Sequence, residues 1–158
     1  MALRFNRLAL AGAGLAAVLT AGAIAVADGG SARSGPAVAL SVADSYIPLP
    51  PGDGMAAGYL TVRNTGSSQD TLVGVSSPGA SSVTLHRSTD TSMAEVASMD
   101  VPARGTLTLA RGGAHLMIMG WQKPPAVGDQ LELDLTFAKG GTIAVRVPVK
   151  PLTYRPGS

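Results

Sequence analysis

The chain has 158 residues, of which 46% are apolar and 14% are charged, so it can form one domain with a real core. Its net charge of +2 comes from Arg4 and Arg7; the remaining ten basic residues balance ten acidic ones. Nucleic-acid binding through a basic patch is therefore not expected. Cysteine does not occur in the sequence, which excludes disulfides, thiolate metal sites, thiol catalysis and lipid attachment through an N-terminal cysteine.

Residues 1–27 have the pattern of a signal peptide. The two arginines precede an apolar run over residues 8–25, and Ala25-Val26-Ala27 forms a small-x-small cleavage site. The alternative is an uncleaved N-terminal membrane anchor, because the run approaches the ~20 residues that span a bilayer. Both interpretations predict an extracytoplasmic location for the rest of the chain, whether periplasmic, cell-surface or secreted.

The remainder predicts a single all-β domain. Residues 28–37 are small and polar, which is typical of a flexible linker. Short apolar stretches separated by Gly, Pro and Asn turn signals then fill residues 38–149, and residues 150–158 form a short tail. Nine short strands at this spacing favour an antiparallel β-sandwich or barrel. The expected strands span residues 39–47, 57–64, 71–75, 82–87, 93–99, 105–109, 115–119, 130–137 and 142–147.

One of the two histidines begins a strand that also carries methionines. A period of two places His115, Met117 and Met119 on one face, with Leu116 and Ile118 on the core face. Val or Ile suits a strand better than two methionines do. An imidazole and a thioether two residues apart therefore indicate a metal site on this face.

The other histidine lies in a predicted hairpin. A turn centred between Thr89 and Asp90 would place His86 directly opposite Met93, with both side chains on one face. Two imidazoles and two thioethers favour Cu(I), because thioether sulfur selects this ion whereas zinc and iron sites bring carboxylate or thiolate. Met99 is the main rival ligand, since it lies at an even separation from Met93 on the same predicted strand.

A competing interpretation needs no metal. Histidines are more often surface or hydrogen-bonded residues than ligands, and methionines usually fill cores. The chain would then be a metal-free secreted or anchored β-sandwich interaction module, with Met117 in the core. Met55, which follows a turn, is expected to pack in either case. An enzyme is not expected, because the sequence has no G-x-S-x-G turn and no defensible pair of carboxylates.

The spacing of these residues supplies a more specific comparison. Twenty-one residues, 94–114, separate Met93 from the segment His115-Leu116-Met117. With this spacing, and with residues 56–66, 72–78 and 112–120, the chain resembles the bacterial extracytoplasmic copper chaperones called PCu(A)C over roughly residues 39–149. In that family a His, a Met, twenty-one intervening residues and then His-x-Met form the metal motif. The resemblance implies a cupredoxin-like Greek-key fold and singles out Met93 over Met99 and Met117 over Met119.

The resemblance also implies a ligand set and a task. His86, Met93, His115 and Met117 would hold one Cu(I), for delivery by a monomer to an acceptor such as the CuA site of cytochrome c oxidase or an assembly factor. Six residues separate His86 from Met93, four fewer than in the family pattern, and removing an even number preserves the shared face. The His- and Met-rich extension that some members use for Cu(II) has no counterpart in residues 150–158, so a second, Cu(II) site is not expected.

Overall fold

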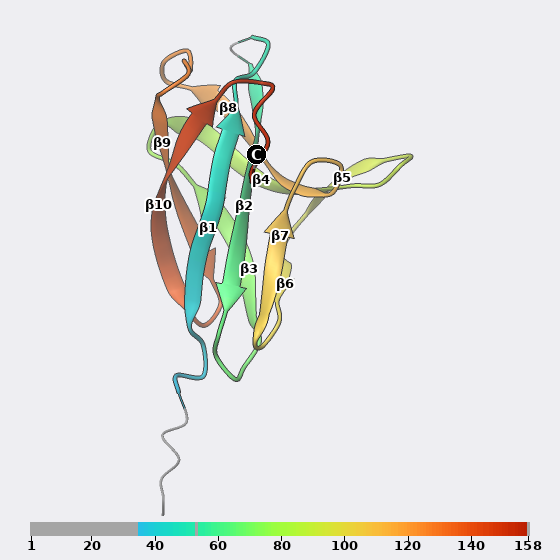
Figure 1. Ribbon diagram of the computed structural model, residues 1–158, viewed down its shortest axis with the longest axis vertical. Helices are drawn as coiled ribbons and strands as arrows, with labels where there is room; N and C mark the ends of the chain where they lie inside the picture. Colours follow the sequence, from blue (N-terminus) through green and yellow to red (C-terminus); the bar gives the residue numbers. More distant parts are fainter. Residues whose placement is uncertain (1–34, 53, 158) are drawn as a thin grey trace, which may run out of the picture. The chain divides into compact units, whose positions relative to one another are not determined.

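The computed structural model describes residues 35–52 and 54–157. The described part of the chain contains ten strands and no helix, and so no helix that could cross a membrane (Figure 1). The predicted signal peptide or anchor, residues 1–27, lies outside the described residues. The strands are β1 (Leu40–Pro48), β2 (Met55–Asn64), β3 (Asp70–Ser76), β4 (Ala80–Ser88), β5 (Met93–Val96), β6 (Met99–Val101), β7 (Gly105–Leu109), β8 (Ala114–Trp121), β9 (Gln130–Phe137) and β10 (Gly141–Lys150).

All ten strands join one sheet in the order β5-β4-β8-β2-β1-β10-β9-β3-β6, with β7 paired to β2. Strand β2 shares its pairing, since β8 pairs with residues 55–58 and β7 with residues 60–64. Contacts between β3 and β4 bring the two ends of this order together. The sheet therefore curls into a nearly closed barrel around one core, which confirms the predicted all-β fold class. Every pair is antiparallel except β1 with β10, which is parallel.

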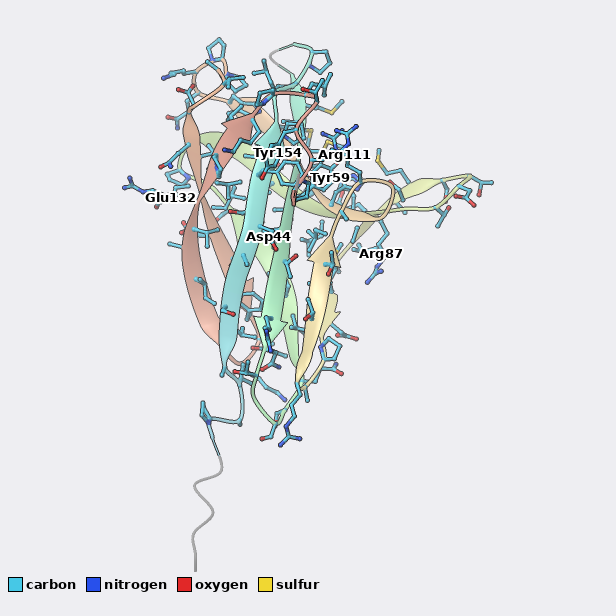
Figure 2. All side chains as sticks on the ribbon, in the orientation of Figure 1. Asp44, Tyr59, Arg87, Arg111, Glu132 and Tyr154 are labelled. Carbon is cyan, nitrogen blue, oxygen red and sulfur yellow. The ribbon has the colours of Figure 1, made fainter. Side chains whose placement is uncertain are left out.

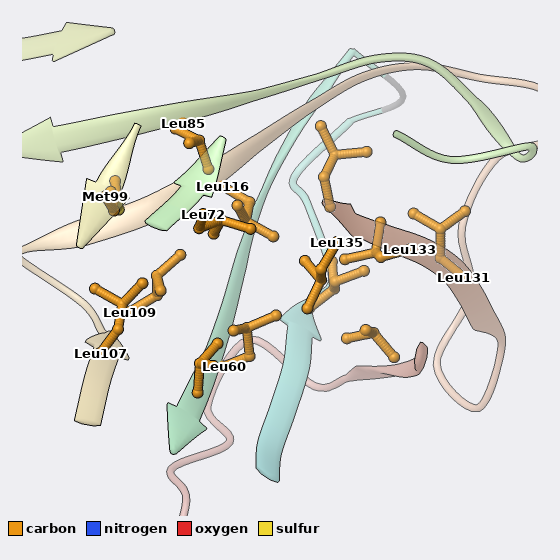
Figure 3. Packing of buried hydrophobic residues seen from close by; sticks show 14 of the residues in the cluster. Leu60, Leu72, Leu85, Met99, Leu107, Leu109, Leu116, Leu131, Leu133 and Leu135 are labelled. Carbon is orange, nitrogen blue, oxygen red and sulfur yellow. The ribbon is translucent and has the colours of Figure 1, made fainter. Parts of the chain in front are cut away.

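Alternation along β9 and β10 fills much of this core. Leu131, Leu133, Leu135 and Phe137 point inward from β9, while polar residues between them face outward. Figure 3 shows the labelled leucines of β9 meeting those of β2, β3, β7 and β8 across the interior. Burial of such side chains provides the main free energy that favours folding.

Asp70, at the start of β3, fastens the β9–β10 turn. Its carboxylate, 1% exposed, accepts the backbone N–H groups of Thr71 at 2.7 Å, Lys139 at 2.9 Å and Gly140 at 2.8 Å. Burial alone would raise the pKa of Asp70, but these three donors and the nearby Lys139 charge outweigh it and lower the pKa. The ionised side chain is therefore part of the fold.

The predicted strand over residues 93–99 is wrong as a single strand. The chain leaves β5 after Val96 and joins β3 through β6, where Met99 pairs with Leu72. Met99 is 1% exposed and lies in the core (Figure 3). Its even separation from Met93 therefore does not put the two methionines on one face, because the intervening Ala97-Ser98 segment changes the direction of the chain.

The two ends of the predicted domain also differ from expectation. Strand β10 continues to Lys150, and the residues after it pack against the domain: the Tyr154 ring lies 5.0 Å from the Tyr46 ring in an edge-on contact. Arg111 Nη2 donates to the Leu152 carbonyl at 3.1 Å. At the other end, the Ala37 carbonyl accepts the Ser68 N–H at 2.7 Å, so this last residue of the predicted linker is held.

Candidate metal centre

Strand β8 has one core face and one outer face, as its sequence period predicts. Leu116 and Ile118 are fully buried in the core. His115, Met117 and Met119 occupy the opposite face, where His115 is 7% exposed and the two methionines are half-buried. Met117 therefore does not belong to the core. The metal-free interpretation expected it there, so that expectation is wrong.

The pairing of β4 with β8 brings the two histidines together. His86 and His115 are direct cross-strand partners, and their rings are stacked with centroids 5.6 Å apart and an interplanar angle of 24°. Two residues along the same ladder, and on the same face, Thr84 opposes Met117. The sequence predicts that the two histidines meet only through a shared metal ion. It does not predict this direct pairing.

The predicted opposition of His86 and Met93 is wrong by two residues. In the β4–β5 hairpin Met93 opposes Ser88, and His86 opposes Glu95. The Thr89 N–H donates to the Ser92 carbonyl at 2.7 Å, so the turn is centred one residue later than expected. A shift of two residues preserves parity, so Met93 still shares a face with His86. It lies two pairs nearer the hairpin tip and is 56% exposed.

Each imidazole has one ring nitrogen in a hydrogen bond and one without. His115 Nδ1 lies 3.1 Å from the Gly113 carbonyl, which can only accept, so Nδ1 carries the proton and the Nε2 lone pair is left for a ligand. His86 Nε2 lies 2.9 Å from Thr84 Oγ1. His86 Nδ1 is buried and has no hydrogen-bond partner among the described residues. Such an orphaned buried nitrogen is costly, and a metal ion would satisfy it.

The other potential ligands on this outer face are thioethers and the carboxylate of Glu95, which opposes His86. On the side of the histidines, four thioethers project from β2, β5 and β8: those of Met55, Met93, Met117 and Met119. Figure 2 labels Tyr59 and Arg111, which lie close together. Within the described ranges no three His, Cys, Asp or Glu side chains form a metal cluster. A site here would depend on thioethers, which favour Cu(I).

Tyr59 on β2 and Arg111, between β7 and β8, lie close together. Tyr59 follows Gly58, the last residue of β2 that pairs with β8. The Arg111 guanidinium carbon lies 5.8 Å from the Tyr59 ring centroid. Burial raises the pKa of Tyr59, and the Arg111 charge offsets this only in part. Tyr59 therefore stays a neutral phenol, and it does not compete with the soft donors as a phenolate.

Known proteins are similar to this chain in sequence and in fold. A family model described as "Putative lipoprotein LpqE-like" matches residues 40–149, nearly the whole described domain. The chain belongs to the LpqE-like family. A relative, "Putative lipoprotein Lxx21020" of Leifsonia xyli subsp. xyli, is 40% identical to this LpqE-like protein over 104 residues. That match spans 63% of this chain and 63% of the relative.

The LpqE-like domain is also similar to solved PCuAC domains. The copper-bound PCuAC domain from PmoF2 matches with a TM-score of 0.64 and 27% identity, over 73% of this chain and 96% of that one. The Cu(I) form of DR1885 from Deinococcus radiodurans matches with a TM-score of 0.59 and 32% identity, over 78% and 85%. The PCu(A)C resemblance and the cupredoxin-like fold are thereby confirmed. The family description, a lipoprotein, agrees with an extracytoplasmic location.

Proposed function

We propose that this LpqE-like domain is an extracytoplasmic copper chaperone that binds one Cu(I) through His86, His115, Met93 and Met117. The observation that carries the proposal is the stacked histidine pair, in which each ring keeps one nitrogen without a protein partner. Met117 lies next along β8 on the same face, and Met93 lies on the neighbouring hairpin. The copper-bound relatives of similar fold support the choice of metal.

The chemistry of the site favours a carrier over an electron-transfer protein or an enzyme. A blue-copper centre is built on two His and one Cys, and the sequence has no cysteine. Imidazole and thioether ligands are neutral, so a Cu(I) ion can be released without separating opposite charges. We infer that the cargo moves by ligand substitution rather than by a redox cycle.

The four ligands differ in how easily an acceptor could replace them. His115 is 7% exposed, whereas Met93 is 56% exposed on β5, the last strand of the sheet order. An acceptor ligand would therefore first displace Met93, then draw the ion from the half-buried His86 and the buried His115. From the family resemblance we propose that the acceptor is the CuA site of cytochrome c oxidase or an assembly factor, and that the carrier acts as a monomer.

A Cu(I) titration under reducing conditions tests this proposal. Residues 28–158, expressed without the leader, should compete with a coloured Cu(I) chelator and give a one-to-one endpoint. The single variants His86→Ala and His115→Ala, and the double variant that combines them, should abolish competition. The reason is that the two imidazole nitrogens supply the strongest donors. Met99→Leu is the matched control, since it changes a thioether that lies in the core and should leave the endpoint intact.

Two results would overturn the proposal. If the parent domain does not compete with the chelator at all, the chain is a metal-free interaction module. If it competes but the two histidine variants compete equally well, the ion binds elsewhere and the ligand assignment is wrong.

A further inference from the structure

Met55 and Met119 form a pair that the proposed copper site does not use. They are direct partners in the β2–β8 ladder. Met55 does not pack as the sequence analysis expected: it is 60% exposed, because its neighbour Ala56 is the residue that turns toward the core. Packing in the core therefore does not explain why the exposed Met55 stands opposite a second methionine.

The geometry allows these thioethers to meet on one ion. Directly opposed residues have Cβ atoms about 4.5–5.5 Å apart, so two flexible methionine side chains can reach a common point. Met117 lies two residues along β8 on the same face, and its β2 partner is Ala57.

Met117 links this pair with the histidines. On the outer face of β8 it lies two residues from Met119 and two residues from His115. Met55 also borders a groove of about 170 Å³, whose lining includes Ala57, Tyr59 and Arg111.

The three thioethers of Met55, Met117 and Met119 favour a soft, singly charged ion. Thioethers carry no charge and favour Cu(I) over zinc, calcium or magnesium. Three thioethers without an imidazole should bind Cu(I) more weakly than the mixed His and Met site. A weaker neighbouring site can take up an ion from solution, or pass it to an acceptor, without retaining it.

We propose that Met55 and Met119, with Met117 shared, form a second and weaker Cu(I) site, through which the ion passes on its way to or from His86 and His115. This inference rests on the proposed copper function of the histidine pair. It adds a site at the far end of the same outer face, where β2 and β8 begin and end their pairing.

Methionine methyl NMR separates the two sites. Protein labelled with ¹³C at the methionine methyl groups is titrated with Cu(I) under anaerobic conditions. The first equivalent should shift the Met93 and Met117 resonances, and the second should shift those of Met55 and Met119. Met99 is an internal control, because it lies 1% exposed in the core and should not shift.

Two variants sharpen the titration. Met55→Leu should remove the Met119 shift at the second equivalent, slow Cu(I) release to a chelator several-fold, and leave the first-site affinity unchanged. Val127→Leu, another exposed apolar position at 53% exposure, is the matched control and should change neither.

The outcomes distinguish the inference from the proposal on which it rests. If Met93 and Met117 shift but Met55 and Met119 never do, or shift together with Met93 at the first equivalent, the second site is refuted and the chaperone site stands. If Met93 and Met117 do not respond to the first equivalent, the proposed function itself fails. In the histidine double variant, a response of Met55, Met117 and Met119 without a response of Met93 would support the second site independently.

Discussion

The β9–β10 and β4–β5 hairpins of this domain are built in opposite ways. The first has eight consecutive paired positions, fully buried Leu133 and Leu135, and a turn fastened by Asp70. The second has four paired positions and ends the sheet order with β5, whose residues are exposed or half-buried. In Figure 1 the β4–β5 hairpin projects beyond the neighbouring strands.

The difference separates stability from binding. Buried apolar side chains and satisfied polar groups in β9–β10 favour folding but leave nothing for a ligand to contact. The β4–β5 hairpin contributes little buried area, yet it carries His86 and Met93 within reach of a partner. Substitutions in the two hairpins should therefore change different measurements.

The largest expected effect is that of Leu133→Ala. Removing this fully buried side chain should lower the free energy of unfolding by about 2–5 kcal/mol, as measured by chemical denaturation. Met93→Ala in the other hairpin should change it by less than about 0.5 kcal/mol, because the side chain is exposed. A comparable loss in both variants would contradict the separation.

Asp70→Ala should come next. It leaves the part-buried N–H groups of Lys139 and Gly140 without their charged acceptor, which should cost about 2–3 kcal/mol of unfolding free energy. The Cu(I) endpoint of the folded variant should equal that of the parent. A variant that unfolds normally but loses copper would show that the two hairpins are coupled.

The same carboxylate should make stability depend on pH. Because the folded-state pKa of Asp70 lies below its ordinary value of 3.8, the ionised form stabilises the fold above that value. This contribution should be lost as the pH falls through the folded pKa. Denaturation of the parent and of Asp70→Ala, compared from neutral pH downward, should converge in that window; a constant difference would refute the assignment.

Thr84→Val should give the smallest effect, and on copper alone. The substitution removes the hydroxyl that fixes His86 Nε2, and loss of such an outer partner should weaken Cu(I) binding about 10-fold in chelator competition. Thr61→Val on β2 is a matched control. Equal affinity in parent and variant would mean that Thr84 does not orient the histidine.

The sequence predicted the β9 strand with its bounds because leucines alternate with charged residues and a Gly-Gly turn follows. The β4–β5 register could not be predicted to the residue. Its tip, Thr89 to Ser92, offers no glycine or asparagine to mark the turn. Parity survived the error, since a shift of two residues keeps every side chain on its face.

The candidate site was predictable as a set of residues but not as an arrangement. The direct pairing of His86 with His115 joins strands distant in sequence, and no local pattern records which strand lies beside β4. Met99 left the candidate set because the chain turns after β5. Met55 could have been recognised from its parity with Ala56, which alternation along β2 directs into the core.

The exposure of the outer-face methionines has a consequence for oxidants. Peroxide converts an accessible thioether to a sulfoxide, whose polar oxygen replaces the soft sulfur donor. Met55 and Met93, 60% and 56% exposed, would react first, whereas Met99 is shielded at 1%. Under oxidative stress the domain would keep its fold, while the proposed Cu(I) binding would weaken until a methionine sulfoxide reductase restored these two thioethers.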